Sequence, residues 1–227
     1  AKLESAIQGY NTLGDKRQVS RCTSTILSIR NVQGGTALNE KNYDAAIGFY
    51  DDAISRKASY AKAYLGKVLA YDKLGDVAKM EENAVTGIEA ATAAKDNKTA
   101  GDIKKKMRGF YFNEAQKNMS EQDYVTGESN LAKSIEYGNS NKNVFYQIGL
   151  AQKGQEKWQE AVESFEQALS MESGDAAAKA KYHFELGAAY LALGNNAKAC
   201  ENYKLSLHGE FAEAAKYQIE NVLKCDE

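Results

Sequence analysis

The stretch FYQIGLAQKGQEKWQEAVESFEQAL, residues 145–169, decides the fold of this chain. It places Gly149 behind an aliphatic residue and Ala161 twelve positions later, and the same arrangement returns at Gly187 and Ala199. A pattern that repeats in this way indicates helical hairpins that stack on their neighbours. Such arrays commonly serve as binding surfaces, so the pattern says more about architecture than about a partner.

The repeat has a regular period. An aromatic or bulky residue marks the expected start of the second helix in each of five units, and Asn196 is the poorest match. These residues are Tyr43, Val77, Tyr124, Trp158 and Asn196. They stand 34, 47, 34 and 38 positions apart, so two gaps share one period and two carry insertions of 13 and 4 residues.

Each unit repeats a set of size-restricted positions. Only small side chains let the two helices of a hairpin approach closely. The compact position of the first helix holds Gly34, Val68, Ala115, Gly149 and Gly187. The compact position of the second helix holds Ala46, Met80, Gly127, Ala161 and Ala199. One turn later the second helix presents a filler, which is Tyr50, Ala84, Leu131, Phe165 or Tyr203.

These residues and their 34-residue period resemble the tetratricopeptide repeat (TPR) family over residues 27–213. The fourth and fifth units match best, whereas Met80 and Gly127 replace the usual alanine in the second and third. The chain also lacks the proline that often closes a repeat. The resemblance implies an all-α, TPR-type α-α superhelix (solenoid) of about five helical hairpins, with capping helices at both ends.

The repeats divide the chain into five segments. Residues 1–26 form an N-terminal capping helical segment, and residues 27–94 hold units one and two. Residues 95–107 are the junction between the insertion and a long helix, with the most hinge-like stretch at 95–101. Residues 108–213 hold units three to five, and residues 211–227 form the C-terminal capping helix. We expect helices over residues 3–13, 20–40 and 211–224.

Composition excludes several function classes. The formal net charge of the 227 residues is −2, from 29 basic and 31 acidic side chains, so no global field favours nucleic acid. No run of 18 apolar residues occurs, so no membrane span is expected. The basic run from Lys104 to Arg108 fans widely around a helix and is interpreted as a solvated face.

The three cysteines leave two alternatives open. Cys200 and Cys225 would lie on antiparallel helices, but counting from the turn at Gly209 leaves them about 10 Å out of register at the helical rise. This favours separate thiols, and a disulfide requires the tail to bend back. Cys22 stays unpaired in either case. Similarity to bacterial secreted TPR proteins favours a periplasmic or secreted location, with a cytoplasmic one as the alternative.

The sequence contains no recognisable catalytic or metal-binding group. His183 and His208 have no carboxylate or thiol partner at metal-ligand spacing, and no phosphate-binding glycine loop occurs. We therefore predict no enzyme, no cofactor and no metal.

The resemblance implies where a partner would bind. First helices line the concave groove of a TPR superhelix, and aromatic anchors dominate interface energetics. The residues placed there are Leu65, Leu69, Phe112, Gln116, Tyr146, Leu150, Phe184 and Leu191. The alternative is that several of them pack against neighbouring helices or the C-terminal cap.

One known binding mode of the family is disfavoured. Its carboxylate clamp needs Lys, Asn and Arg across successive first helices, and this chain offers Asn31, Gly35 and Gly66 there, with Lys62 isolated. We predict a non-catalytic scaffold that binds a protein or peptide segment of unknown identity in the groove. The alternative is a structural protein that forms homo-oligomers through terminal or convex surfaces.

Overall fold

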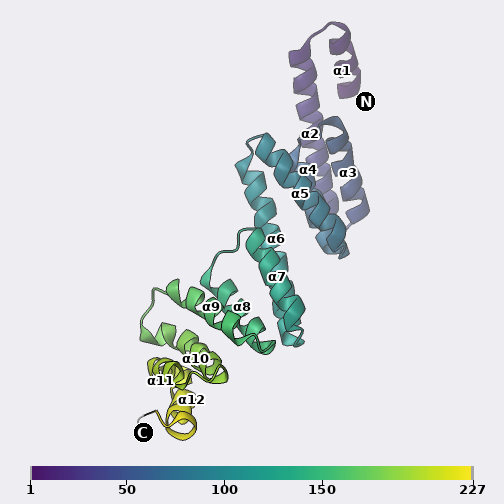
Figure 1. Cartoon of the computed structure of the whole chain (residues 1–227). Coiled ribbons are helices and arrows are strands. Elements are labelled where there is room, and N and C mark those ends of the chain that lie inside the picture. Colours follow the sequence, from purple (N-terminus) through teal and green to yellow (C-terminus); the bar gives the residue numbers. More distant parts are fainter. Residues whose placement is uncertain (1, 226–227) are drawn as a thin grey trace. The chain divides into compact units, whose positions relative to one another are not determined.

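The computed structural model describes residues 2–225, and every regular element among them is a helix (Figure 1). The chain forms two compact units, residues 1–107 (unit 1) and 108–227 (unit 2). Unit 1 contains α1 (Lys2–Thr12), α2 (Lys16–Asn39), α3 (Tyr43–Arg56), α4 (Ala61–Leu74) and α5 (Val77–Ala93). The boundary falls within α6 (Asn97–Ser120).

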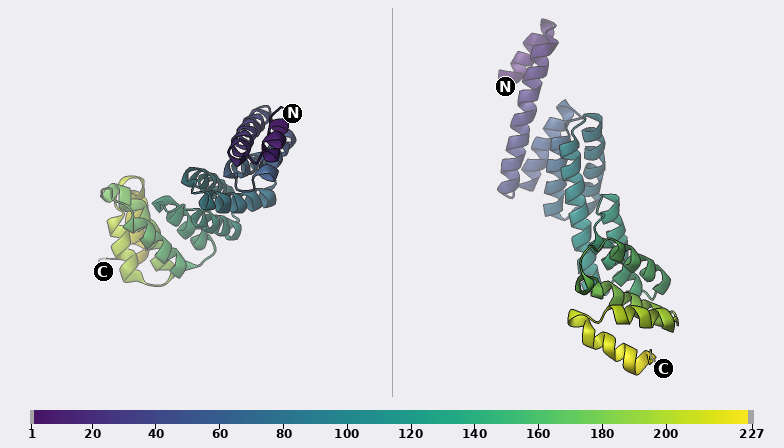
Figure 2. Two further views of the ribbon diagram at one scale, coloured as in Figure 1. Left: turned by 90° about the horizontal axis from the view of Figure 1, so that it is seen from above. Right: turned by 90° about the vertical axis from the view of Figure 1, so that its left-hand side faces the viewer.

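Unit 2 continues with α7 (Tyr124–Glu136), α8 (Lys142–Gly154), α9 (Trp158–Ser170), α10 (Ala176–Ala192) and α11 (Asn196–Leu205). It ends with the 3-10 helix η1 (Gly209–Phe211), α12 (Ala212–Tyr217) and the π-helix η2 (Gln218–Leu223). Successive helices form antiparallel pairs within each unit (Figure 2). The predicted all-α helical-repeat fold is confirmed.

The five marker residues predicted to open second helices do so. Helices α3, α5, α7, α9 and α11 begin at Tyr43, Val77, Tyr124, Trp158 and Asn196. The turn before most of them has one construction: a residue with left-handed backbone is followed by an Asn or Asp that caps the helix. At Gly75 and Asp76, for example, φ of the glycine is +72° and the carboxylate accepts from the amide of Lys79. This cap satisfies one of the free amides at a helix start.

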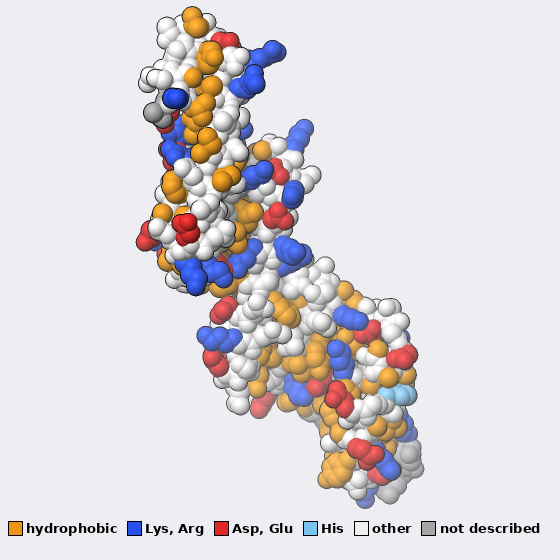
Figure 3. Space-filling model, turned by 180° about the vertical axis from the view of Figure 1, so that it is seen from behind, with side chains coloured by type: hydrophobic (Ala, Val, Ile, Leu, Met, Phe, Trp, Pro, Cys, Tyr) orange, Lys and Arg blue, Asp and Glu red, His pale blue; other side chains and the backbone are white. Residues whose placement is uncertain are grey.

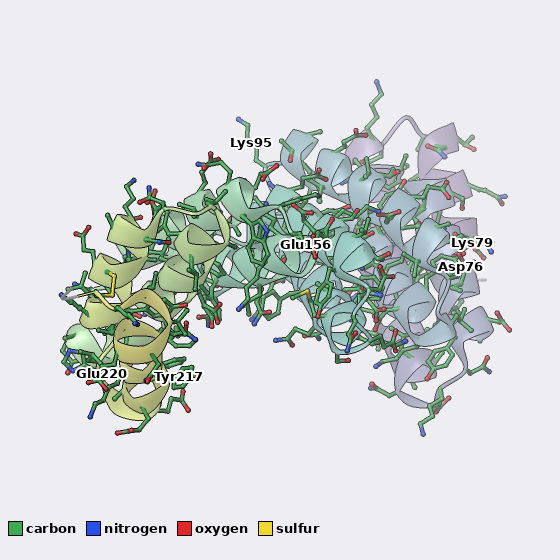
Figure 4. The ribbon with its side chains drawn as sticks, turned by 60° about the horizontal axis from the view of Figure 1, so that its bottom comes forward. Asp76, Lys79, Lys95, Glu156, Tyr217 and Glu220 are labelled. Carbon is green, nitrogen blue, oxygen red and sulfur yellow. A yellow bond between two sulfur atoms is a disulfide. The ribbon has the colours of Figure 1, made fainter. Side chains whose placement is uncertain are left out.

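The same turn occurs without glycine at several sites. Lys95 and Glu156, labelled in Figure 4, have φ of 58° and 60°. After Glu156, Lys157 provides no side-chain cap for α9. The shape of the turn therefore follows from the packing of the hairpin and does not require the best turn residues at every unit.

In the first, fourth and fifth hairpins an aromatic ring of the second helix packs where the first helix has a glycine. The second and third hairpins have Val68 and Ala115 at that position. Phe165 of α9 lies against Gly149, and a Cβ on that glycine would lie 2.5 Å from the ring. Tyr203 of α11 lies in the same way against Gly187, at 2.9 Å. The first-helix and second-helix compact positions and the filler positions are buried in all five units. The spacing of small residues thus sets how closely the helices approach.

At the N-terminus, the helix predicted over residues 3–13 is present as α1, and it packs on α2. Asp52 of α3 accepts from Arg30 of α2 at 2.6 Å and from Arg56 at 2.9 Å. Arg56 also reaches Glu4 of α1 at 2.8 Å, so three helices share one charge network. Hydrophobic side chains are visible along this hairpin (Figure 3). Leu13, in the turn after α1, is 79% exposed.

The two insertions lengthen helices. α6 has 24 residues and α10 has 17, whereas α8 has 13. The stretch expected to be most loop-like, 95–98, is a loop only at Lys95 and Asp96, because Asn97 already begins α6. The division between units lies at Met107 and Arg108, beyond the 95–101 stretch predicted as a hinge.

The preference for separate thiols at Cys200 and Cys225 is wrong, because the structure joins them in a disulfide with Cα atoms 5.6 Å apart. The tail bends back: Lys224 adopts left-handed backbone with φ of 49°, and the amide of Cys225 donates to the carbonyl of Ile219. The predicted cap over 211–224 is helical but changes from α to π winding at Gln218. Cys22 is a free thiol.

Replacing a core glycine tests this packing. We expect Gly149→Ala to destabilise the fold by about 1–3 kcal/mol, because the new methyl group would overlap the Phe165 ring. Gly101→Ala is the control, since a Cβ there meets open space on helix α6; it should stabilise by about 0.5–1 kcal/mol. Urea unfolding of both variants measures the difference, and equal effects would contradict this account of the core.

Candidate functional site

Unit 1 contains a hollow of about 510 Å³ between the first helices of its hairpins and the start of α6. Apolar side chains form much of its lining, and Tyr50 reaches it from the second helix α3. Polar side chains of α2, α4 and α6 complete it. The lining residues are Asn31, Gly35, Leu38, Asn39, Tyr50, Lys62, Leu65, Gly66, Leu69, Asp96, Lys98, Thr99 and Asp102.

Two glycines make the hollow possible. The Tyr50 ring packs against both Gly34 of α2 and Gly66 of α4, so that one side chain bridges two successive first helices. Gly35 has nothing within 4 Å of where a Cβ would stand. A larger residue at position 35 would therefore point into free space and could reduce the volume of the hollow.

The charged groups of the hollow are balanced. Lys62 and Lys98 are exposed, and Asp102 is exposed as well. Asp96 accepts from the hydroxyl and the amide of Thr99, and these hydrogen bonds, aided by the nearby lysines, hold the pKa of Asp96 below its usual range. The hollow therefore offers two cations and two carboxylates, and one of the carboxylates, that of Asp96, already accepts hydrogen bonds at the N-terminus of α6.

A second group of partly buried aromatic and aliphatic residues lies in unit 2. Tyr146 and Leu150 of α8 and Phe184 and Leu191 of α10 all pack against the core of the last hairpins. The Tyr146 ring contacts the rings of Phe165 and Tyr182, at centroid distances of 5.7 and 5.4 Å. These side chains are half-buried, so part of each remains available on the surface of the unit.

A buried carboxylate lies at the centre of this second group. Glu185 of α10 accepts from Lys153 of α8 at 2.6 Å. Burial, aided by the charge of Glu185, raises the pKa of Tyr203 to about 12. Burial also raises the pKa of Tyr146, with Glu185 as the next largest cause. The Lys153–Glu185 pair thus links two successive first helices inside a largely apolar face.

The eight residues predicted to line a groove fall into separate sets. Leu65 and Leu69 line the hollow of unit 1. Tyr146, Leu150, Phe184 and Leu191 share the core-facing group of unit 2. Phe112 is half-buried against the packing of α6, α7 and α8, whereas Gln116 is exposed. The role of these residues in one binding groove stays a prediction.

Most of the polar lining of the hollow is not evident from the sequence. Asn31, Gly35, Gly66 and Lys62 argue against a carboxylate clamp, and the structure brings all four to one hollow. Asn39, Lys98 and Asp102 also line it, and no sequence pattern assigns them to a binding site. Their signal was weak because each is a single exposed polar residue whose neighbours come from other helices.

Across residues 2–225, no group of three His, Cys, Asp or Glu side chains could hold a metal ion. None of the helices described there is long and apolar enough to cross a membrane.

The raised pKa of Tyr203 predicts a loss of stability at high pH. A free tyrosine titrates near pH 10, so between about pH 10 and about 12 the unfolded chain releases this proton before the folded chain does, which favours unfolding. Tyr203→Phe keeps the ring against Gly187 and should make the stability fall less steeply over that window. Urea unfolding at stepped pH measures the slope, with Tyr217→Phe at an exposed site as control. A slope unchanged by Tyr203→Phe would contradict the assignment.

Comparison with solved structures finds similar helical folds at low identity. The chain is similar to the MamA protein, with 16% identity, a TM-score of 0.41, and 88% of this chain and 97% of that chain covered. It is similar to a chain of the APC/C hetero-tetramer Cut9-Hcn1, with 16% identity, a TM-score of 0.47, and 90% and 37% covered. It is also similar to YrrB, described as a TPR protein with an unusual peptide-binding site, with 17% identity, a TM-score of 0.42, and 81% and 88% covered. No curated protein gives a significant match.

A family-level match falls on the stretch that decides the fold. Residues 143–175 match the family model of the tetratricopeptide repeat. They cover the hairpin of α8 and α9, where Phe165 packs on Gly149. The other hairpins place their own small residues and fillers at the equivalent positions, so residues 143–175 are a tetratricopeptide repeat within a longer array of helical hairpins.

Proposed function

We propose that this chain is a scaffold that binds an extended segment of another protein in the hollow of unit 1. The observation that carries the proposal is the hollow itself. It has a volume of about 510 Å³ and is bounded by α2, α4 and the start of α6, which are the first helices of consecutive hairpins. Binding pockets commonly have volumes of roughly 300–1,000 Å³. The hollow is large enough for a few side chains of a peptide.

The chemistry of the lining fits a peptide segment. Leu65 and Leu69 offer an apolar surface for a side chain, and Leu69 is exposed. Asn31 and Asn39 carry amides that can donate to a peptide carbonyl and accept from a peptide amide. Burial of apolar side chains would supply affinity, and the amides would fix the direction of the segment.

The proposal assigns no reaction to the hollow. Binding of a protein segment needs no chemical step there. Assembly into homo-oligomers stays a prediction.

Filling the hollow tests the proposal. Peptides that bind the wild-type chain are first selected from a random displayed library, and their affinities are then measured for Gly35→Met. We expect the variant to bind at least about tenfold more weakly, because the new side chain would occupy the hollow. Gly48→Met is the matched control, since Gly48 also faces open space but lies on α3 outside the hollow. Equal affinities for the two variants would reject the hollow as the site.

We further infer that the chain works in an oxidising compartment, such as the periplasm or the cell exterior. The support is the Cys200–Cys225 disulfide, because such bonds persist where thiols are not kept reduced. Alkylation of intact cells followed by mass spectrometry should modify Cys22 and leave the other two cysteines protected. Modification of all three would contradict this location.

A further inference from the structure

The C-terminal cap, defined here as η1, α12 and η2 (residues 209–223), covers the last hairpin of unit 2. Its buried side chains Ala215 and Ile219 join the core formed by α10 and α11. At the start of the cap, η1 lies against α10. The cap therefore occupies a surface of the last repeat that a further hairpin or a partner could otherwise contact.

The cap places the aromatic side chain of Phe211 against Phe184, one of the residues predicted to bind a partner. The ring of Phe211 lies 5.4 Å from the ring of Phe184, between centroids. The Phe184 ring also meets the Tyr203 ring edge-on, with centroids 5.5 Å apart. Phe184 thus already binds one aromatic side chain, supplied by the chain itself. This contact indicates which chemistry the α10 surface accepts: an aromatic ring packed at a tilt against a half-buried aromatic neighbour.

The non-covalent hold on the cap is weak. Among residues 212–223 only Ala215 and Ile219 are buried, while Tyr217 and Val222 are 58% and 48% exposed. Tyr217 and Glu220, labelled in Figure 4, are both exposed. The helix also changes to π winding after Tyr217, and π-helices are rare and short. A helical segment of about a dozen residues is marginal by itself in water.

A covalent bond holds the end of this weakly packed segment. Cys225 follows the left-handed residue Lys224 and is joined to Cys200 on α11. Both cysteines are only half-buried, so a reductant can reach them. The disulfide closes a loop that contains the whole cap, since the two residues are 25 positions apart. A bond of this kind restricts the free chain and favours the docked state.

We propose that the cap is a displaceable occupant of an aromatic-binding site on α10, locked by the Cys200–Cys225 disulfide, and that a protein segment carrying an aromatic side chain replaces Phe211 when a dithiol opens the lock. In that step the dithiol gives two electrons and two protons, the Sγ–Sγ bond breaks, and Cys200 and Cys225 become thiols. The dithiol leaves as a disulfide. This site is separate from the hollow of unit 1, so either proposal can fail without the other.

Hydrogen exchange tests whether the disulfide locks the cap. The full chain carrying Cys22→Ser is compared with and without dithiothreitol, so that reduction acts on this one bond. We expect protection of amides in residues 212–223 to fall about 100-fold on reduction, while α8 and α9 keep theirs. Cys200→Ser/Cys225→Ser should reproduce the reduced state without reductant. Unchanged protection in the cap would overturn the proposal, and so would loss of protection throughout unit 2.

A peptide taken from the chain tests the aromatic site. The probe is a labelled peptide of residues 208–224, which contains Phe211 and no cysteine. Fluorescence anisotropy should show it binding the reduced chain at least tenfold more tightly than the oxidised chain. The same peptide with Phe211→Ala should bind the reduced chain at least tenfold more weakly. Equal binding of the two peptides, or equal binding to both redox forms, would overturn the proposal.

Discussion

The first, fourth and fifth hairpins depend on one steric constraint: an aromatic ring of the second helix fits where the first helix has a glycine. Phe165 meets Gly149 and Tyr203 meets Gly187 in this way. Tyr50 extends the rule, because it contacts glycines on two successive first helices and also lines the hollow of unit 1. The packing that holds unit 1 together therefore also shapes its proposed binding surface.

Features governed by side-chain size were predictable from the sequence. The starts of the second helices and the buried compact positions follow from residue identity at a fixed spacing, which is a local property of the chain. The hollow was not predictable, because Asn39, Lys98 and Asp102 are ordinary exposed residues until three helices bring them together. Leu65 and Leu69 were predicted because the family resemblance, rather than periodicity, assigned them to the inner surface.

The C-terminus shows a different limit of sequence reasoning. Counting residues along two ideal helices separates Cys200 from Cys225, because that count assumes a constant rise. The chain instead changes winding at Gln218 and reverses at Lys224, and it brings the two sulfur atoms together. Neither change has a sequence signature of the strength of a glycine or an Asn-Gly turn, since lysine has no special preference for left-handed backbone.

Most packed helix pairs are adjacent along the chain, as with α4 and α5, α8 and α9, and α10 and α11. Proteins dominated by such local contacts have low contact order and fold quickly. With no proline in the sequence, prolyl isomerisation cannot delay this process. Because each hairpin contacts mainly its neighbours, an insertion can lengthen one helix without disturbing distant hairpins. The long helices α6 and α10 are consistent with such insertions. The architecture therefore permits evolution by local insertion while the packing of the other hairpins is retained.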